Sequence, residues 1–372
     1  MKSLGIGLIG TGYMGKCHAL AWNSVASVFG DVPRPRFVAL AEVNAELAGK
    51  KAAEFGFGTS TGEWRDLLTN PEIDVISITT PNAFHPEMAI SALEAGKHVW
   101  CEKPMAPKLE DAVSMRDAAK IAGRTAVMGY NYIQNPMIRH MRRLIDEGAI
   151  GKVNHVRVEM DEDFMADPAT PFYWKSELAS GYGALDDFAV HPLSLLFALF
   201  GHVETVVTDM VKPYPTRPLK DGGNREVENH DIASVLMRLE DGISAVLMAD
   251  RSAWGRKGRL ALQIFGSEGS ILYDQERMNE FQIYQASGRP EEQGFRTVLA
   301  APHHRPYDRF IPAPGHGLGF NDLKVIECRE LMAAIDGSDA HVISFEDGLR
   351  IERAVHAMAR SHAERRWIDV PH

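Results

Sequence analysis

The segment of residues 75–104 constrains the fold of this chain more than any other. It reads as a strand, a turn, a helix and a second strand that ends in Glu102-Lys103-Pro104. Residues 75–79 are apolar and β-branched, which predicts a buried strand, and the helix-forming run 86–95 stops at a glycine. Open parallel sheets bind ligands at the carboxyl ends of their strands. The sequence therefore predicts that Lys103 faces a bound molecule; the alternative is an ordinary surface lysine.

A glycine-rich loop follows the first apolar strand, residues 4–9, and precedes a predicted helix over residues 18–25. Between a strand and a helix, the pattern GxGxxG indicates a dinucleotide-binding loop. Its first glycine allows a tight turn, the second lets a pyrophosphate approach the backbone, and the third lets the helix pack closely on the strand. The helix N-terminus offers N–H groups to phosphates. The predicted cofactor loop consists of Gly10, Thr11, Gly12, Tyr13, Met14 and Gly15; the alternative is a glycine-rich turn without a ligand.

Glu42 ends the next predicted strand, residues 37–41. An acidic residue at this place in a dinucleotide-binding unit holds the ribose hydroxyls. A carboxylate there repels the 2′-phosphate of NADP, and no arginine follows directly. The sequence therefore favours NAD over NADP as cofactor; otherwise Glu42 is a solvated residue before the helix at 44–55.

The turn after residues 75–79 supplies further cofactor-binding candidates near the expected nicotinamide: Thr80, Pro81, Asn82 and His85, with Glu102 and Lys103 from the next strand end. For His85 two roles are equally open, lining the pocket or capping the following helix.

Strands and helices alternate over the first part of the chain, which predicts an α/β fold with an N-terminal Rossmann domain, a doubly wound parallel sheet, over residues 1–130. From residue 131 to 372 the pattern changes. Half-exposed strands at 153–160, 232–239, 244–250 and 259–264 predict a C-terminal α/β domain with an open, mainly antiparallel sheet. Long helices at 321–335 and 345–363 close the chain, and residues 212–229 and 288–319 read as loops. The open face of the sheet suggests a homodimer or homotetramer.

Composition excludes several classes of protein. The net charge is −10, with no block of Lys or Arg, which argues against nucleic acid as a partner. No apolar run reaches the ~18 residues of a membrane span. Cys17, Cys101 and Cys328 lie far apart, as expected for a protein of the reducing cytoplasm. The histidines show no metal-ligand spacing, so no metal site is expected.

A second cluster of chemical groups lies in residues 180–191. Asp187 and His191 are spaced i, i+4, so a regular helix places them on one face. A carboxylate raises the basicity of an imidazole, and the pair can take a proton from a hydroxyl. Asp186 points about 100° away on such a helix and is expected to act as a cap. The alternative, a helix cap with a core histidine, is favoured for this motif alone, but Lys103 and the glycine loop reverse that preference.

Together, GTGYMG, AGKHVWCEKP and GYGALDDFAVH resemble the Gfo/Idh/MocA oxidoreductase family over essentially the whole chain. The resemblance implies NAD(P)-dependent oxidation of a ring hydroxyl on a sugar, inositol or related polyol. It assigns the catalytic group to Lys103, Asp187 and His191: His191 would be the acid/base, Lys103 would polarise the hydroxyl oxygen and Asp187 would tune both. Within the family, the proline-rich insertion at 31–36 is similar to that of inositol and anhydrosugar dehydrogenases.

Three positions depart from the usual family pattern, namely Ala189, Ile133 and Lys175, where many members have glycine, arginine and arginine. The last two lie near the expected substrate pocket, so the substrate cannot be copied from a typical inositol enzyme. Substrate-binding residues are predicted to be Lys103, Tyr132, Asp163, Trp174, Lys175, Asp187 and His191, with Asn82, His85, Tyr173, His230, Asp231 and His316 as further candidates. Two alternatives to a dehydrogenase remain, an NAD-dependent glycosidase and a catalytically silent dinucleotide sensor.

Overall fold

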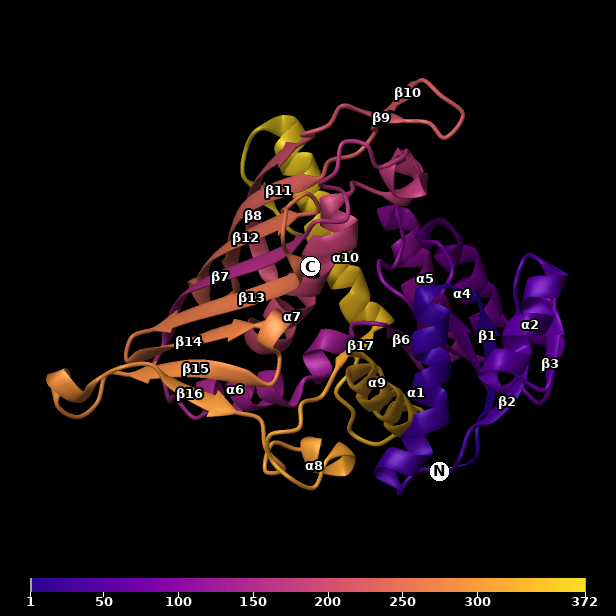
Figure 1. The fold of residues 1–372 in the computed structure, drawn as a ribbon, viewed down its shortest axis with the longest axis horizontal. Helices are drawn as coiled ribbons and strands as arrows, with labels where there is room; N and C mark the ends of the chain where they lie inside the picture. The colour runs from indigo at the N-terminus through magenta and orange to yellow at the C-terminus, as the bar shows by residue number, and fades with distance from the viewer. Residues whose placement is uncertain (1, 372) are drawn as a thin grey trace. The chain divides into compact units, whose positions relative to one another are not determined.

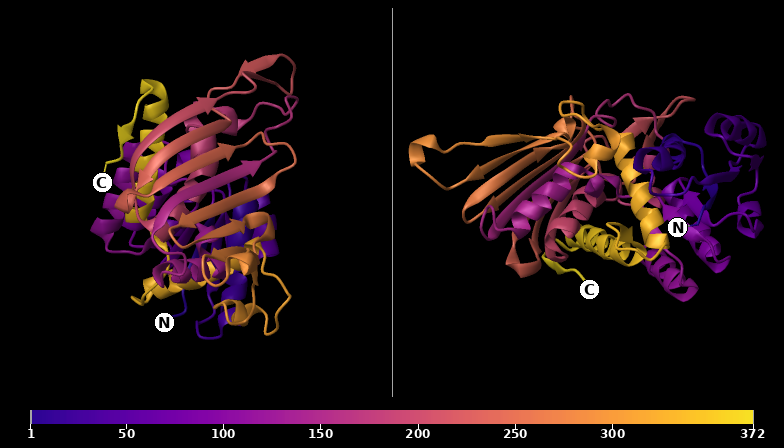
Figure 2. Two further views of the ribbon diagram at one scale, coloured as in Figure 1. Left: turned by 90° about the vertical axis from the view of Figure 1, so that its left-hand side faces the viewer. Right: turned by 90° about the horizontal axis from the view of Figure 1, so that it is seen from below.

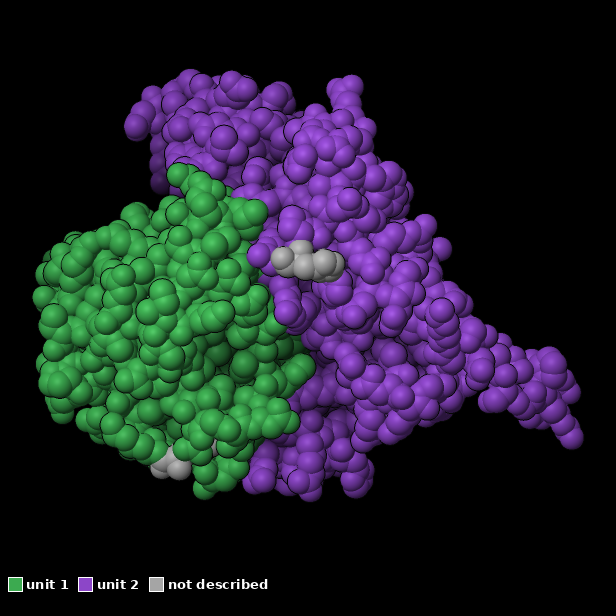
Figure 3. Space-filling view, turned by 180° about the vertical axis from the view of Figure 1, so that it is seen from behind, with its two compact units in different colours: residues 1–134, 318–349 green, residues 135–317, 350–372 purple. Residues whose placement is uncertain are grey.

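Two sheets organise the chain in the computed structural model, which describes residues 2–371. They belong to two units, residues 1–134 with 318–349 and residues 135–317 with 350–372, coloured separately in Figure 3. The first unit therefore takes in a late segment that the sequence-based division at residue 130 assigned to the second domain.

The first unit is built on a seven-stranded sheet in the order β17-β6-β5-β4-β1-β2-β3. Every pair is parallel except β17–β6. Strands β3 to β6 therefore have the 3-2-1-4-5-6 order of a dinucleotide-binding sheet, which confirms the predicted doubly wound fold. The strands are β1 (Gly5–Ile9), β2 (Arg36–Ala41), β3 (Thr59–Thr61), β4 (Val75–Ile78), β5 (His98–Cys101), β6 (Ala126–Met128) and β17 (Ile343–Ser344).

The helices of this unit cover both faces of the sheet. The strand order runs outward from β1 in one direction and from β4 in the other, so right-handed crossovers put α1 and α4 on opposite faces. Helix α9 packs along α1, and α5 packs along α4. The helices are α1 (Tyr13–Phe29), α2 (Ala45–Phe55), α3 (Asp66–Thr69), α4 (His85–Glu94), α5 (Leu109–Ala122) and α9 (Phe320–Ile335). Helix α1 thus begins five residues earlier than predicted, directly after the loop's second glycine.

The second unit contains a nine-stranded sheet in the order β16-β15-β14-β13-β7-β12-β11-β8-β18. Only β7 and β12 pair in parallel, which confirms the mainly antiparallel sheet. The strands are β7 (Val153–Glu162), β8 (Val203–Val211), β11 (Ile232–Leu239), β12 (Ser244–Asp250), β13 (Lys257–Gly266), β14 (Gly269–Asp274), β15 (Glu280–Gln285), β16 (Arg296–Leu299) and β18 (Ile368–Asp369), with a separate pair β9 (Thr216–Pro218) and β10 (Asn224–Glu226).

Helices cover one face of this sheet and leave the other open, as the two views of Figure 2 show. They are α6 (Pro136–Asp146), α7 (Val190–Phe200) and α10 (Phe345–Glu364), while the short α8 (Tyr307–Phe310) lies apart from the sheet (Figure 1). Alternating burial follows from this one-sided cover. In β11, Val235 and Met237 are buried, whereas Leu236 between them is 50% exposed.

Two segments that the sequence predicts to be loops contain short regular elements. The span 212–229 contains the β9–β10 pair, and 288–319 contains β16 and α8. These short elements lie among prolines and glycines, so no apolar period marks them in the sequence. No helix within residues 2–371 has the length and apolar character needed to cross a membrane.

Candidate active site

The glycine-rich loop of the first unit has the shape that a pyrophosphate requires. Gly10 has φ +91°, a conformation that favours glycine, and a Cβ on Gly15 would lie 2.4 Å from the carbonyl oxygen of Gly10. A Cβ on Gly12 would meet no atom within 4 Å, so the backbone there is open to a ligand. Helix α1 begins directly after Gly12, and its first turn has no acidic side chain. The residues present therefore fit a dinucleotide.

Glu42 lies beside this loop, at the end of β2. Its Oε2 accepts hydrogen bonds from Thr11 N at 3.1 Å and Thr11 Oγ1 at 2.6 Å. The carboxylate is thus held against the edge of the loop, where the sequence places the ribose hydroxyls. Of the other predicted loop residues, Tyr13 is exposed and stacks on Phe320 at 5.9 Å between ring centroids, and Met14 is half-buried.

Beyond β4, the His85 ring ties two backbone segments together. Its Nδ1 lies 2.8 Å from the Pro104 carbonyl oxygen and its Nε2 lies 2.9 Å from that of Thr80. Burial lowers the pKa of His85, although the hydrogen bonds with the carbonyls of Pro104 and Thr80 act to raise it. A neutral imidazole has one N–H, so the ring donates to one of these carbonyls at a time. Asn82 is buried close by in sequence, on the turn Asn82–Phe84. His85 thus joins the turn after β4 to the segment that carries Lys103.

The carboxylate of Glu102 is fixed in the interior rather than exposed at the strand end. Its Oε1 lies 2.5 Å from Lys324 Nζ and 2.8 Å from His18 Nε2. Lys324 also lies 2.8 Å from Glu327 Oε2, and all four side chains are at least 95% buried. The backbone N–H of Lys103 donates to Glu102 Oε2 at 3.3 Å. The cluster therefore anchors the residue directly before Lys103.

The electrostatics of this cluster are set by burial and by Lys324. Burial would raise the pKa of Glu102, but Lys324 and the hydrogen bond from His18 outweigh it and hold that pKa well below its usual range. Burial lowers the pKa of His18 to about 4 and raises that of Glu327 to about 7. At neutral pH, Glu102 is thus the ionised partner of Lys324, while His18 is neutral and donates from Nε2.

The second unit holds the other part of the predicted site. Asp187 lies in a π-helical turn, Leu185–Ala189, that leads into α7. Lys175 Nζ lies 2.9 Å from both carboxylate oxygens of Asp187, and Arg251 Nη1 lies 3.7 Å from Oδ2. Asp187 is thus paired with two cations, one turn before the buried His191.

Arg251 is in turn fixed by buried groups behind Asp187. It donates to Asp231 Oδ1 at 2.7 Å and to Asn229 Oδ1 at 3.0 Å. A Cβ on Gly183 would lie 2.2 Å from the His230 carbonyl oxygen and 3.0 Å from Arg251 Nη2, which requires glycine there. Arg251 is not among the site residues predicted from the sequence; its position directly after β12 is the only signal for it there.

The π-helical turn changes the predicted role of Asp186. Its carboxylate accepts from the Tyr182 backbone N–H and is 2% exposed. Burial raises the pKa of Asp186 to about 7, and the charge of Asp187 adds to the shift. Asp186 therefore fixes the entry to α7 by binding back to the preceding loop.

The remaining candidates divide into two groups. Tyr173 and Trp174 lie with the Asp187 cluster: Lys175 Nζ is 5.7 Å from the Trp174 ring, and burial with Asp187 raises the pKa of Tyr173 to about 12. Asp163 instead binds Lys257 Nζ at 2.5 Å. Tyr132 contacts Phe320 in the first unit, His230 packs against His362, and His316 binds the Pro314 carbonyl through Nδ1.

The described residues contain no group of three or more His, Cys, Asp or Glu arranged to hold a metal ion.

The sheet order, the open glycine loop and Glu42 define a dinucleotide-binding protein of the Rossmann class. The chain belongs to the Gfo/Idh/MocA family: a model described as "Oxidoreductase family, NAD-binding Rossmann fold" matches residues 4–132, and the C-terminal domain model of that family matches residues 138–272. This confirms the resemblance and the nicotinamide cofactor expected from it.

Two similar proteins and one solved structure cover essentially the whole chain. Levoglucosan dehydrogenase from Pseudarthrobacter phenanthrenivorans is 36% identical over 100% of this chain and 99% of its own length. A solved structure titled levoglucosan dehydrogenase in complex with NADH and levoglucosan has a TM-score of 0.95 and 36% identity, with full coverage of both chains. Inositol 2-dehydrogenase from Rhizobium meliloti is 25% identical over 98% of each chain.

Proposed function

We propose that this protein is an NAD-dependent dehydrogenase that oxidises a ring hydroxyl of a sugar, anhydrosugar or inositol, with an anhydrosugar as the first candidate. One observation carries the proposal: the similarity to levoglucosan dehydrogenase extends over the full length of both chains, and so includes the cofactor loop as well as the segment of Asp187 and His191.

The proposed chemistry uses Lys103, Asp187 and His191. Bound NAD would supply the acceptor for the hydride that leaves the ring carbon. His191 takes the hydroxyl proton as the carbonyl forms, and Lys103 donates a hydrogen bond to the oxygen, which stabilises the charge that develops there. Asp187, paired with Lys175 and Arg251, raises the basicity of His191.

The cofactor would be held by the loop from Gly10 to Gly15, with Glu42 on the ribose. The nicotinamide side would be lined by Thr80, Pro81, Asn82 and His85, and Glu102 would act through the backbone of Lys103, which it binds. In this assignment residues 1–130 bind cofactor and residues 131–372 bind substrate and form the oligomer.

We further propose a homodimer or homotetramer that uses the open face of the large sheet. An apolar row crosses that face, because Leu236 pairs with Val207 on β8 and Val246 on β12. A cytoplasmic location is supported by Cys17, Cys101 and Cys328, which are buried free thiols.

The test is cofactor reduction, followed by nicotinamide absorbance, with NAD or NADP and a panel of levoglucosan, aldoses, inositols and glycosides. Reduction of NAD with levoglucosan or another cyclic polyol is the expected result. Release of free sugar without net NADH would replace the proposal with a glycosidase. Binding of NADH without turnover on any member of the panel would replace it with a sensor.

A further inference from the structure

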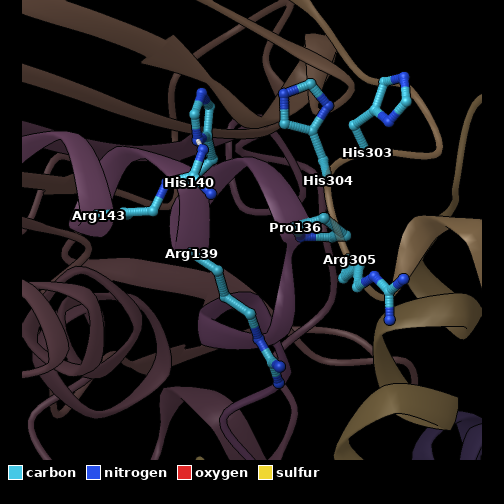
Figure 4. A pocket seen from close by; sticks show the side chains of 7 residues that line it. All are labelled: Pro136, Arg139, His140, Arg143, His303, His304 and Arg305. Carbon is cyan, nitrogen blue, oxygen red and sulfur yellow. Dashed lines mark hydrogen bonds between the residues drawn. The ribbon is translucent and has the colours of Figure 1, made fainter.

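A pocket of about 340 Å³ lies in the second unit, where helix α6 meets the segment around residue 304 (Figure 4). Its lining comes from one face of α6 and from three consecutive residues of the chain before α8. The lining residues are Pro136, Arg139, His140, Arg143, His303, His304 and Arg305.

The charge of this lining is one-sided. It holds three arginines and three histidines, and none of the seven residues is acidic, although the whole chain has a net charge of −10. Arg139 and Arg143 are spaced i, i+4 on α6, an arrangement of like charges that destabilises a helix. The Arg143 Nε pairs with Glu147 only at 3.7 Å on an exposed surface, a contact that contributes little. Arg305 is exposed and forms no ion pair with any residue in the range 2–371.

The hydrogen bonds of two histidines fix where their protons lie. Arg143 Nη2 donates to His140 Nδ1 at 2.8 Å, and the Ala301 backbone N–H donates to His304 Nδ1 at 3.1 Å. An arginine or a backbone N–H can only donate, so each neutral ring accepts on Nδ1 and keeps its proton on Nε2. The two rings lie 4.8 Å apart, and no residue in the described part of the chain accepts from either Nε2. The pocket thus offers two N–H donors in addition to the guanidinium groups.

We propose that this pocket binds a phosphate group, either free or carried by a small organic molecule. Guanidinium groups match the geometry of phosphate oxygens, and the two Nε2–H groups add directed donors. A volume of about 340 Å³ leaves room for a small molecule around the anion, since ligand pockets begin near ~300 Å³. In Figure 4 the three imidazoles lie in the upper part of the view, and the side chains of Arg139 and Arg305 extend toward the lower part. This site is independent of the proposed dehydrogenase activity.

A protonation effect accompanies the proposed binding. Burial and the charges of His304, Arg143 and Arg296 lower the pKa of His140 to about 4, and burial, Arg143 and His303 lower the pKa of His304. A bound anion favours the charged imidazoles and raises both pKa values, so binding takes up protons. Affinity for sulfate, which stays a dianion, should therefore increase as the pH falls from 7 to 5.

The experiment is isothermal titration of the purified full chain with inorganic phosphate, glycerol 3-phosphate, sulfate, citrate and glycerol. We expect saturable binding of the phosphates and sulfate, tighter sulfate binding at pH 5 than at pH 7, and none for glycerol. Tighter binding of glycerol 3-phosphate than of phosphate would identify a phosphorylated metabolite as the ligand, and equal binding would identify free phosphate. Citrate binding as tight as phosphate binding, or no saturable binding of either phosphate, overturns the proposal.

Variants locate the binding. Arg305→Gln and Arg143→Gln change exposed side chains, so the fold should tolerate both, and each should weaken phosphate binding by about tenfold or more. Arg289→Gln removes an exposed arginine of the same unit that lies outside the pocket and should leave the affinity unchanged. If all three substitutions weaken binding equally, the anion is attracted by positive charges across the surface in general. That result would overturn the proposal that the anion binds in this pocket.

Discussion

Lys324 Nζ lies 2.5 Å from Glu102 Oε1, although 222 residues separate the two in sequence. Glu102 directly precedes the proposed catalytic lysine, and Lys324 lies on α9. The position of Lys103 thus depends on a helix near the end of the chain as well as on the strand that leads to it. Because both side chains are buried with His18 and Glu327, removing Lys324 leaves the Glu102 carboxylate without its cation.

Replacing this lysine by a neutral side chain of similar shape should be strongly destabilising. We expect Lys324→Met to lower the free energy of unfolding by about 3–5 kcal/mol, because the Glu102 carboxylate stays buried without its cation. Urea unfolding followed by circular dichroism measures the change. Lys50→Met removes an exposed lysine from α2 in the same unit and should change stability by less than about 0.5 kcal/mol. A loss as small as that for Lys324→Met would contradict the buried pair.

The free energy of unfolding should depend on pH below about 6.5 because of His18. Burial lowers its pKa from 6.5 to about 4, so between these values the unfolded chain binds more protons than the folded one. Stability from this group is present above pH 6.5 and is lost as the pH falls toward 4, by up to about 3 kcal/mol. His18→Gln keeps an N–H donor for Glu102 and should remove this part of the pH dependence. NMR titration of the imidazole checks the cause directly; a midpoint near 6.5 for His18 would contradict it.

Loss of the proposed acid/base groups should slow turnover without loss of the cofactor. His191→Ala and Lys103→Ala are each expected to reduce kcat by about 10²- to 10⁴-fold on the true substrate, because the hydroxyl proton loses its acceptor or the oxygen its donor. NADH binding, followed by fluorescence, should stay within a factor of a few. Near-wild-type turnover for either variant would remove that residue from the mechanism.

Asp187→Asn provides a separate measure of the ion pair with Lys175 and Arg251. The substitution keeps the size of the side chain and removes the charge that two cations surround. If Asp187 raises the basicity of His191, kcat should fall and the acidic limb of the pH–rate profile, which reports the pKa of the base, should move to lower pH. An unchanged profile with a lowered kcat would assign Asp187 a purely structural role.

The cofactor preference should depend on Glu42. Its carboxylate repels a 2′-phosphate, so Glu42→Ser is expected to strengthen NADP binding by at least about tenfold relative to NAD. The Kd values for both cofactors give the ratio, with Glu42→Asp as the control that keeps the charge. If the ratio does not move with Glu42→Ser, this residue does not read the ribose.

The apolar row on the open sheet tests the proposed oligomer. Leu236→Asp places a charge between Val207 and Val246, which a buried interface would not tolerate. Sedimentation velocity should show smaller particles than for the wild type. Leu178→Asp, an exposed leucine outside the large sheet, should leave the particle size unchanged. The same size for all three proteins would place the interface elsewhere or leave a monomer.

Local patterns account for what the sequence predicts well. The loop from Gly10 to Gly15, Glu42 at the end of β2 and Lys103 after β5 each follow from a strand and the few residues after it. The four strands expected in the second half were found within three residues of their predicted bounds.

Long-range contacts account for what the sequence does not reveal. Lys324 and Glu327 read as an ordinary i, i+3 surface pair, since nothing near them shows that Glu102 will bury them. Arg251 looks like a residue after a strand, and only the folded chain brings it to Asp187 and Asp231. Likewise, the π-helical turn at Leu185–Ala189 has no signature in a sequence that fits a regular helix equally well.

The return of residues 318–349 to the first unit has a consequence for the gene. The first unit lacks α9 and β17 until these residues are present, and the second lacks most of α10 and all of β18 until the chain reaches its last residues. A stop codon anywhere before residue 318 therefore leaves both units unfinished, with Glu102 and His18 buried beside no lysine. Neither unit is encoded by one continuous stretch of the gene. Recombination should therefore transfer the two units together rather than one of them alone.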